Sequence, residues 1–220
     1  MPVRLRRALL LALAAALASC APAHEERASF LLITCDTLRA DQLGFLGHAR
    51  PTSPNLDALA AESVVFERAW STAPLTGPAL SALLTGRPPE ELGLSDNRVW
   101  LGEAAETLAE RARAAGIETA AVVSNWVLRK RERGGVQQGF EHFDDTMRTA
   151  EASRPDLKER LAADTTDAAL AWLAGRDPAR PFFLWVHYQD PHGPYTPPAD
   201  CLAPFPPEAR GEPTLGVGQD

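Results

Sequence analysis

The side chains most able to do chemistry in this sequence stand where predicted strands or helices begin or end. Thr76 precedes Gly77, Pro78 and a short apolar helical pattern, so it falls at a predicted helix N-terminus. One interpretation is a helix cap, because a threonine oxygen can accept a backbone N–H of the first turn. The other is a nucleophile beside a bound anion, because the same N–H groups and the helix dipole attract negative charge. The stretch alone leaves both interpretations open.

Five further candidates follow predicted strands. Asp36 ends the run SFLLITCD, Ser124 and Asn125 end IETAAVVSN, and His187 near the end of PFFLWVHY is followed by His192. Ligands of a parallel sheet collect at the carboxyl ends of its strands, so these side chains are expected to face one cleft. Two simpler interpretations remain open, since Asp36 can cap a loop and His187 can be a structural residue of a strand end.

The elements that must hold these residues alternate between helix and strand. The run from Ser29 to Asp36 is almost wholly apolar, which is typical of a strand buried on both faces of a parallel sheet. Alternation of this kind predicts an α/β domain with a mostly parallel central sheet flanked by helices. The predicted strands are 29–36, 64–70, 117–125 and 181–188, and the predicted helices are 53–60, 76–85, 107–115 and 157–174.

The N-terminus has the features of a secretion signal. Three arginines precede an apolar run that is too short to form a stable transmembrane span. The ending Leu17-Ala18-Ser19-Cys20 resembles the lipobox of bacterial lipoproteins, which implies that Cys20 becomes the lipidated first residue of the mature chain. The other interpretation is an ordinary signal peptide with a chance cysteine. Because Ala21 gives no reason for inner-membrane retention, the expected location is the cell envelope, on the outer membrane and facing the periplasm.

The expected organisation has four parts. Residues 1–19 are the signal peptide, 20–28 a tether, 29–200 the folded domain and 201–220 a tail rich in proline and glycine. The net charge is −7 before the basic signal peptide is removed, which argues against a general phosphate-contacting surface and hence against nucleic acid as a partner. In an oxidising compartment Cys35 and Cys201 can pair, although Cys35 fits a buried strand residue equally well.

Four motifs occur in an order that resembles one known family. CDTLRADQLGFLG, PTSPNLDALAAESVVFERAWS, LLTGRPP and FFLWVHYQDPHGPYTPP extend over most of the segment between Phe30 and Pro198. They resemble the sulfatase family of the alkaline phosphatase superfamily. The resemblance implies an alkaline-phosphatase-like layered α/β domain, a divalent metal ion (Ca, Mg, Mn or Zn) and substrates that are sulfate or phosphate esters.

The same resemblance assigns roles to individual residues. Asp36 takes the place of a metal-binding aspartate, and Thr37 stands where many sulfatases have a second one. Thr76 falls on the nucleophile position, where it would also contact the metal. His192 matches a substrate-side histidine, a candidate donor to the ester or leaving-group oxygen. Asn97 stands where phosphate-processing relatives have an asparagine that donates to a non-bridging oxygen, although turn chemistry explains it equally well.

Thr76 also bears on the type of ester. Sulfatases oxidise a Cys or Ser in the pattern C/S-x-P-x-R to formylglycine, whereas this chain has Thr76 and no arginine in that pattern. Threonine is instead the nucleophile of related phosphodiesterases and phosphoethanolamine transferases, once a metal activates its hydroxyl. Ser124 and Asn125 replace the family's lysine and histidine as polar groups near the substrate. The sequence therefore favours phosphoester or phosphodiester cleavage.

The resemblance is incomplete at its C-terminal end. The remaining metal ligands of the family lie in a Ser-Asp-His-Gly type of segment, and none follows Pro198. The domain is therefore expected to be truncated at its C-terminus. Besides the phosphoester hydrolase, two interpretations stay open: a sulfuric ester hydrolase, and a catalytically inactive envelope lipoprotein.

Overall fold

A four-stranded parallel sheet forms the centre of the computed structural model, which describes residues 28–150, 158–193, 195, 197–202 and 205. The strands are ordered β1-β6-β2-β3, and β6 pairs with β1 on one side and β2 on the other. A separate two-stranded antiparallel sheet joins β4 to β5. The bounds are β1 Phe30–Cys35, β2 Glu118–Val123, β3 His142–Asp144, β4 Thr149–Ala150, β5 Lys158–Glu159 and β6 Phe182–Tyr188.

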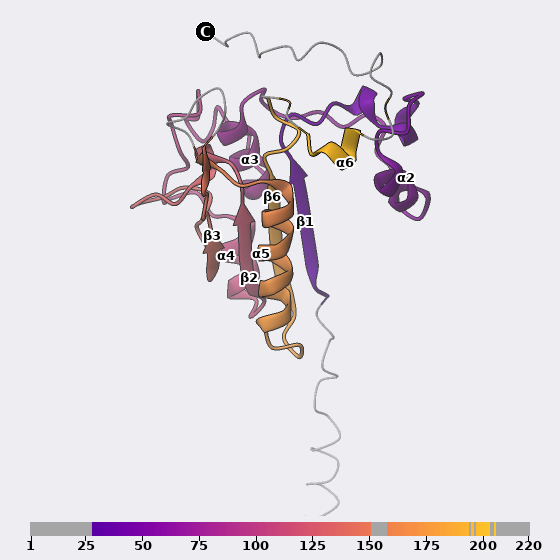
Figure 1. Cartoon of the computed structure of the whole chain (residues 1–220). Helices are drawn as coiled ribbons and strands as arrows, with labels where there is room; N and C mark the ends of the chain where they lie inside the picture. The colour runs from indigo at the N-terminus through magenta and orange to yellow at the C-terminus, as the bar shows by residue number, and fades with distance from the viewer. Residues whose placement is uncertain (1–27, 151–157, 194, 196, 203–204, 206–220) are drawn as a thin grey trace, which may run out of the picture.

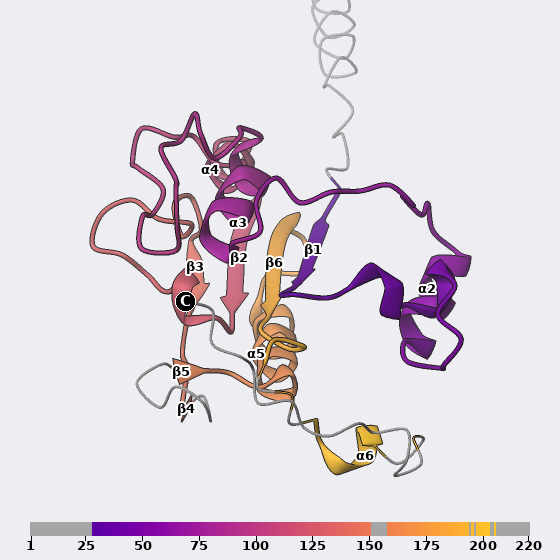
Figure 2. The same ribbon diagram turned by 90° about the horizontal axis from the view of Figure 1, so that it is seen from above.

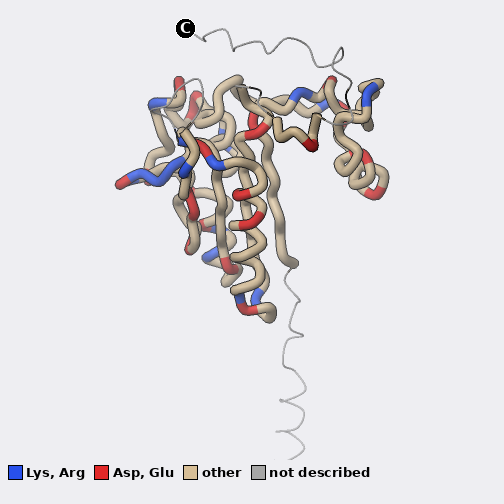
Figure 3. The backbone as a smooth tube through the Cα atoms, viewed as in Figure 1, with Lys and Arg blue, Asp and Glu red and all other residues tan. Residues whose placement is uncertain are grey.

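Helices cover both faces of this sheet, which gives three layers. In Figures 1 and 2, α3 and α4 lie on one side of the sheet and α5 lies on the other. Figure 3 shows acidic residues in the upper part of α5. The acidic residues of this helix, Asp164 and Asp167, both lie in its first half. The helices are α2 Pro54–Ala61, α3 Thr76–Thr85, α4 Leu108–Ala114, α5 Ala162–Gly175 and α6 Ala199–Leu202, with short 3₁₀ helices η1 Ala40–Gln42, η2 Gly44–Leu46 and η3 Trp126–Leu128.

Local sequence signals account for several helix ends. Thr107 and Glu110 form a capping box at the start of α4, in which each side chain accepts a hydrogen bond from the other's backbone N–H. Pro54 occupies the first turn of α2, where its missing N–H removes no helical hydrogen bond. After α3 the chain turns at Gly86, whose φ of 69° lies in the left-handed region that glycine adopts without strain.

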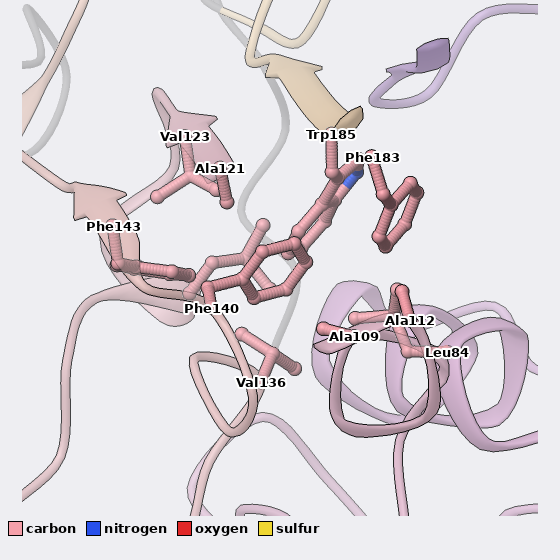
Figure 4. Close-up of a cluster of buried hydrophobic side chains, with 11 residues drawn as sticks. Leu84, Ala109, Ala112, Ala121, Val123, Val136, Phe140, Phe143, Phe183 and Trp185 are labelled. Atoms are coloured by element: carbon pink, nitrogen blue, oxygen red, sulfur yellow. The ribbon is translucent and has the colours of Figure 1, made fainter. Parts of the chain in front are cut away.

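The larger core lies between the sheet and the α3–α4 layer. Figure 4 shows Phe140 beside Trp185, whose ring centroids are 5.9 Å apart, with Phe183 next to them. Leu84 of α3 and Ala109 of α4 close this cluster from the helical side. A second cluster joins β2 and β6 to α5 on the opposite face. Both clusters are centred on β2 and β6. Ser124 directly follows β2, and His187 lies within β6.

Most of the predicted elements are confirmed, and three expectations are wrong. The predicted strands 29–36, 117–125 and 181–188 correspond to β1, β2 and β6, in a parallel sheet flanked by helices. Residues 64–70 form no strand, and Val64 and Trp70 are 83% and 81% exposed. The last predicted helix begins at Ala162 rather than 157, because Lys158–Glu159 pairs as β5.

The third correction concerns the burial of β1. Among the described residues the strand pairs only with β6, and α5 packs on β2 and β6, so Leu31 and Ile33 stay 55% and 53% exposed. An apolar run predicts a strand, but its burial depends on which elements pack against it. Cys35 is exposed as well, contrary to the interpretation as a buried strand residue, and Cys35 and Cys201 are both free thiols.

The predicted signal peptide, the tether up to residue 27 and Cys20 lie outside the described residues, as does most of the predicted tail. Within the part that the structure describes, none of the helices has the length and apolar character needed to cross a bilayer.

Candidate active site

Asp36 is the centre of a group of polar side chains at the carboxyl ends of β1, β2 and β6. Its backbone N–H donates to the carbonyl of Tyr188 at 2.9 Å, which continues the β1–β6 pairing by one residue. The carboxylate is thereby fixed at the edge of the sheet where a parallel fold collects its ligands.

Thr76 reaches this carboxylate from the start of α3. Its Oγ1 lies 3.1 Å from Oδ2 of Asp36 and 3.4 Å from Oδ1, so the hydroxyl donates to the carboxylate. The capping interpretation of Thr76 is wrong, because Leu75 is the N-cap residue and Thr76 is the first residue of the helix. The hydroxyl is therefore held by a side chain 40 residues away in the sequence rather than by its own helix.

Asn125 provides a second donor to Asp36. Its Nδ2 lies 2.5 Å from Oδ2, while its Oδ1 accepts the backbone N–H of Val127 at 2.8 Å. That second bond begins the 3₁₀ helix η3, so the amide is held at both ends and only 6% exposed. Asn125 was expected to contact the substrate, but here it orients the carboxylate.

His187 lies beneath the same carboxylate and is 1% exposed. Its Nδ1 is 2.8 Å from Oγ1 of Thr34, and its Nε2 is 3.8 Å from Oδ2 of Asp36. Nε2 is buried and has no hydrogen-bond partner among the described residues. Burial acts to raise the pKa of Asp36, but the neighbouring imidazole of His187, with smaller contributions from His192 and Thr76, lowers it below its ordinary value. Asp36 is therefore held as a carboxylate.

The side chains of Asn97 and Ser124 form hydrogen bonds with backbone groups of the fold. Oδ1 of Asn97 accepts the backbone N–H of Gly77 at 2.8 Å, which leaves its Nδ2 as the group that can donate. Ser124 is fully buried, and its hydroxyl donates to the carbonyl of His187 at 2.7 Å while accepting the N–H of Gln189 at 2.6 Å. Ser124 thus joins the ends of β2 and β6, and its one proton is already donated.

His192 follows β6 at the same end of the sheet. Its Nδ1 contacts the carbonyl of Gly193 at 2.7 Å, and no hydrogen bond joins its ring to Asp36 or Thr76 within the described part of the chain. The side chain is partly exposed. The structure thus brings Asp36, Thr76, Asn125 and His187 together, and places His192 outside their hydrogen bonds.

A match to a family model accompanies this geometry. The model described as Sulfatase matches residues 28–213, which is most of the chain and includes every residue of the group around Asp36. The chain belongs to the sulfatase family.

Individual relatives agree with this assignment. The sulfatase-family chain is 29% identical over 197 residues to the N-acetylglucosamine-6-O-sulfatase of Bacteroides thetaiotaomicron, a match that covers 84% of this chain and 35% of the relative. Thus the chain spans about a third of that relative's length.

Two solved structures share the fold. One is a phosphonate monoester hydrolase of Agrobacterium radiobacter, with a TM-score of 0.65 and 23% identity, covering 83% of this chain and 44% of that one. The other is in complex with its substrate D-glucosamine-2-N,6-O-disulfate, with a TM-score of 0.64, 23% identity, and coverage of 78% and 36%. At this identity the likeness establishes the alkaline-phosphatase-like fold, as the sequence predicted.

The described residues of this sulfatase-family chain do not make a metal site by themselves. Sulfatases usually bind a divalent ion, and such hard cations take several oxygen ligands. Among the described residues no three His, Cys, Asp or Glu side chains converge, and Asp36 is the one carboxylate in the group. No chemical step is therefore assigned to a metal here.

A cavity of about 740 Å³ adjoins this group. Thr37, the residue after Asp36, lines it together with Pro191, the residue before His192. Arg39, Asn55 and Tyr195 add polar groups to its wall. A cavity of this size has room for the organic part of an ester, and its lining reaches the group only through these neighbours in sequence, since Thr76 itself does not line it.

Sequence reasoning missed Thr34. Its signal was present, since Thr34 is a polar residue within the apolar run of β1, but only the structure shows that it lies opposite His187 across the β1–β6 pairing.

Proposed function

We propose that the chain is the nucleophile-bearing part of a phosphoester or phosphodiester hydrolase. The observation that carries the proposal is the hydroxyl of Thr76, held 3.1 Å from the Asp36 carboxylate at the start of α3. Family membership supports hydrolysis of an ester, and threonine at this position supports phosphate over sulfate, because only Cys or Ser is converted to formylglycine. The whole protein's activity and substrate are part of this proposal, since the chain spans 35% of its sulfatase relative.

The proposed reaction has two displacements. Oγ1 of Thr76 attacks phosphorus, its proton leaves along the hydrogen bond to Asp36, and the bond from phosphorus to the leaving oxygen breaks. His192 protonates that oxygen, so an alcohol departs and a phosphothreonine remains. Water then attacks phosphorus and gives a proton to His192, the Oγ1–phosphorus bond breaks, and Oγ1 takes its proton back from Asp36, which regenerates the hydroxyl of Thr76.

Electrostatic support comes from neutral donors. Nδ2 of Asn97 is placed next to the first turn of α3, because its Oδ1 is bound to the N–H of Gly77. A neutral donor aimed at a non-bridging oxygen stabilises the charge that develops in the transition state. A divalent ion, where the complete site binds one, would supply further positive charge at the same place.

The test compares p-nitrophenyl sulfate with a p-nitrophenyl phosphodiester, using wild type, Thr76→Ala and Thr76→Ser. We expect preference for the phosphodiester, and a loss in turnover of roughly 1,000-fold or more for Thr76→Ala, since groups of one site act as a unit. Thr76→Ser keeps the hydroxyl and should retain part of the rate. Thr85→Ala, at the far end of α3, is the matched control and should leave turnover unchanged.

Two outcomes would contradict the proposal and favour a different function. A clear preference for the sulfate would favour the sulfuric ester hydrolase that the family name suggests. No activity that depends on Thr76, together with no tightly bound divalent ion, would favour a catalytically inactive envelope lipoprotein. Metal content measured on purified protein separates these cases, because a catalytic domain of this family should bind about one ion.

We also propose that the protein is anchored to the bacterial outer membrane through lipid on Cys20, facing the periplasm. Its support is the Leu17-Ala18-Ser19-Cys20 ending of the signal-like N-terminus. Several acyl chains anchor a protein stably where a single one does so only marginally. Cys20→Ala should therefore move the protein from the membrane fraction to the soluble fraction. Unchanged membrane partition without acyl mass on the N-terminal peptide would contradict this proposal.

A further inference from the structure

Three side chains form a line from the core to the candidate active site. Nε1 of Trp185 lies 3.0 Å from Oγ1 of Thr34, and the same Oγ1 lies 2.8 Å from Nδ1 of His187. Thr34 and His187 are direct partners across the β1–β6 pairing, so the sheet itself fixes the second contact. Trp185 and His187 are both at most 1% exposed, and Thr34 between them is partly exposed.

The donors and acceptors in this line fix where the imidazole proton lies. An indole N–H can only donate, so Oγ1 of Thr34 accepts from Trp185. The single proton of the Thr34 hydroxyl then has one acceptor among the described residues, Nδ1 of His187. In a neutral ring whose Nδ1 accepts, the proton is carried by Nε2. In the opposite tautomer Nδ1–H and the indole N–H would both donate to Oγ1, the hydroxyl proton of Thr34 would have no acceptor among the described residues, and the lone pair of Nε2 would face the Asp36 carboxylate.

The nitrogen that carries this proton faces Asp36. Nε2 of His187 is buried, has no partner among the described residues, and lies 3.8 Å from Oδ2. Oδ2 already accepts from Asn125, with the hydroxyl of Thr76 beside it. At 3.8 Å an Nε2–H group does not hydrogen-bond to Oδ2, but its partial positive charge faces the carboxylate. A ring with its lone pair at Nε2 would instead offer a metal ligand.

We propose that Thr34 and Trp185 are positioning residues that hold His187 as its Nε2–H tautomer, so that an N–H group of His187, and not a lone pair that a metal could bind, faces Asp36. The inference rests on the proposed function only in that Asp36 must be held in place for Thr76. Because Asn125 and Thr76 bond to Oδ2 and His187 faces it, Oδ1 is the carboxylate oxygen of Asp36 that has fewer protein donors.

The ring tautomer can be read directly by NMR. The full chain is labelled with ¹⁵N, and its histidine ring nitrogens are observed through long-range proton couplings at about pH 8, where an ordinary imidazole is neutral. His187→Gln identifies the His187 signals by their loss. We expect Nδ1 to have the shift of an unprotonated nitrogen and Nε2 that of a protonated one. The reverse pattern in wild type would overturn the inference without any further variant.

Variants then test the two positioning residues. Thr34→Val removes the hydroxyl at nearly constant size and should shift the tautomer ratio toward Nδ1–H by about tenfold, the factor that one net hydrogen bond supplies. Thr34→Ser should restore the wild-type ratio, and Trp185→Phe should shift it less than Thr34→Val. Thr165→Val is the control for loss of a threonine hydroxyl away from the line, since Thr165 lies on α5 and donates to the carbonyl of Leu161. A wild-type ratio in folded Thr34→Val would show that Thr34 does not set the tautomer.

Activity separates this inference from the proposed function. Outer partners of an active-site group typically change activity by roughly 10- to 100-fold, so Thr34→Val should lower kcat within that range with little change in KM, and Thr34→Ser should recover it. If wild type has the Nε2–H tautomer but cleaves no phosphoester, the proposed function fails while the assignment of His187 stands. If wild type cleaves the phosphoester but has the Nδ1–H tautomer, the reverse holds.

Discussion

Apolar residues are buried in one region of the molecule and exposed in another. The two regions are the sheet region, which consists of the central sheet and the helices packed on it, and the outer segment, residues 37–72. In the sheet region, the central residues of β2 and β6 are almost completely buried between α3–α4 and α5. In the outer segment Leu43 is the only apolar side chain that is buried, and α2 contains no buried residue. Figures 1 and 2 both show α2 lying away from the sheet.

The difference shows that apolar pattern and burial are separate properties. Leu59 of α2 and Leu84 of α3 both lie in short apolar helices, yet Leu59 is 62% exposed and Leu84 is 1% exposed. Both helices lie within the residues that match the sulfatase family model. The difference in burial therefore does not arise because one helix lies outside the family's sequence. What separates them is the presence of packing partners within the described chain.

The largest expected difference between the two regions is in hydrogen exchange. Amides of β6 should exchange only through opening of the sheet, whereas amides of α2 should exchange through local opening that exposes little new apolar surface. For a domain with a stability of at least about 5 kcal/mol, the rates should differ by roughly 1,000-fold or more. Peptide-level exchange read by mass spectrometry measures this. Equal protection of α2 and β6 would remove the distinction drawn between the regions.

Truncation of matched leucines should sharpen the comparison. Leu184 of β6 is fully buried, and Leu184→Ala should lower the free energy of unfolding by about 2–5 kcal/mol through lost burial and a cavity. Leu59→Ala, on the exposed surface of α2, should change it by less than about 0.5 kcal/mol. Urea unfolding of both variants is the measurement. A large loss for Leu59→Ala would show that α2 packs more tightly in solution than its exposure indicates.

Two ion pairs offer a smaller contrast. Arg160 and Asp144 are joined at 2.6 Å with side chains only 6% and 22% exposed, whereas Arg39 and Asp41 in the outer segment are 71% and 60% exposed. Asp144→Asn should destabilise the fold by about 3 kcal/mol, because it leaves a buried guanidinium without its partner. Asp41→Asn should leave the unfolding midpoint unchanged.

The pH dependence of the Asp144 effect has a definite sign. Burial acts to raise the pKa of Asp144, but the hydrogen bond from Arg160 prevails and holds it below the ordinary value of 3.8. The pair therefore stabilises the folded state fully above pH 3.8 and loses this effect as the pH falls through the lowered pKa. The difference between wild type and Asp144→Asn should shrink in that acidic range, and a difference that grew there would contradict the assignment.

The smallest contrast concerns single hydroxyls. Thr107 is fully buried, closes the capping box of α4 and donates to the carbonyl of Gln138 at 2.9 Å. Thr107→Ala should therefore cost about 1–2 kcal/mol. Ser71 in the outer segment bonds only to Ala73 nearby and is exposed, so Ser71→Ala should be close to neutral. Thermal unfolding of the two variants, compared at one pH, is sufficient to tell them apart.

Local signals predicted much of the fold. β1, β2 and β6 follow from continuous apolar runs, and α3 and α4 follow from helical periodicity with glycine just beyond their ends. The strand expected at 64–70 was wrong for a physical reason: its apolar residues meet no pairing strand in the described part of the chain, and pairing is a long-range property that a local pattern does not contain. β3 was missed because three residues are too few to form a period.

The candidate site was predictable in outline but not in its connections. Strand ends located Asp36, Asn125 and His187, and the parallel topology explains why they meet. The roles of Ser124 and Thr34 depend on hydrogen bonds between strands 63 and 153 residues apart, which no local pattern specifies. The resemblance to the family suggested the role of Thr76, and the structure shows that its hydroxyl donates a hydrogen bond to the Asp36 carboxylate.

The exposed apolar side chains of β1 and of residues 64–70 have a consequence for how the protein is handled at the bench. Leu31, Ile33, Phe66 and Trp70 are each more than half exposed in the folded chain. Dyes such as ANS, which fluoresce on apolar surface and are read as a sign of partly folded states, will bind the native chain. A dye-based melting curve will therefore start from a high signal, and circular dichroism is the sounder measure of folding for each variant described above.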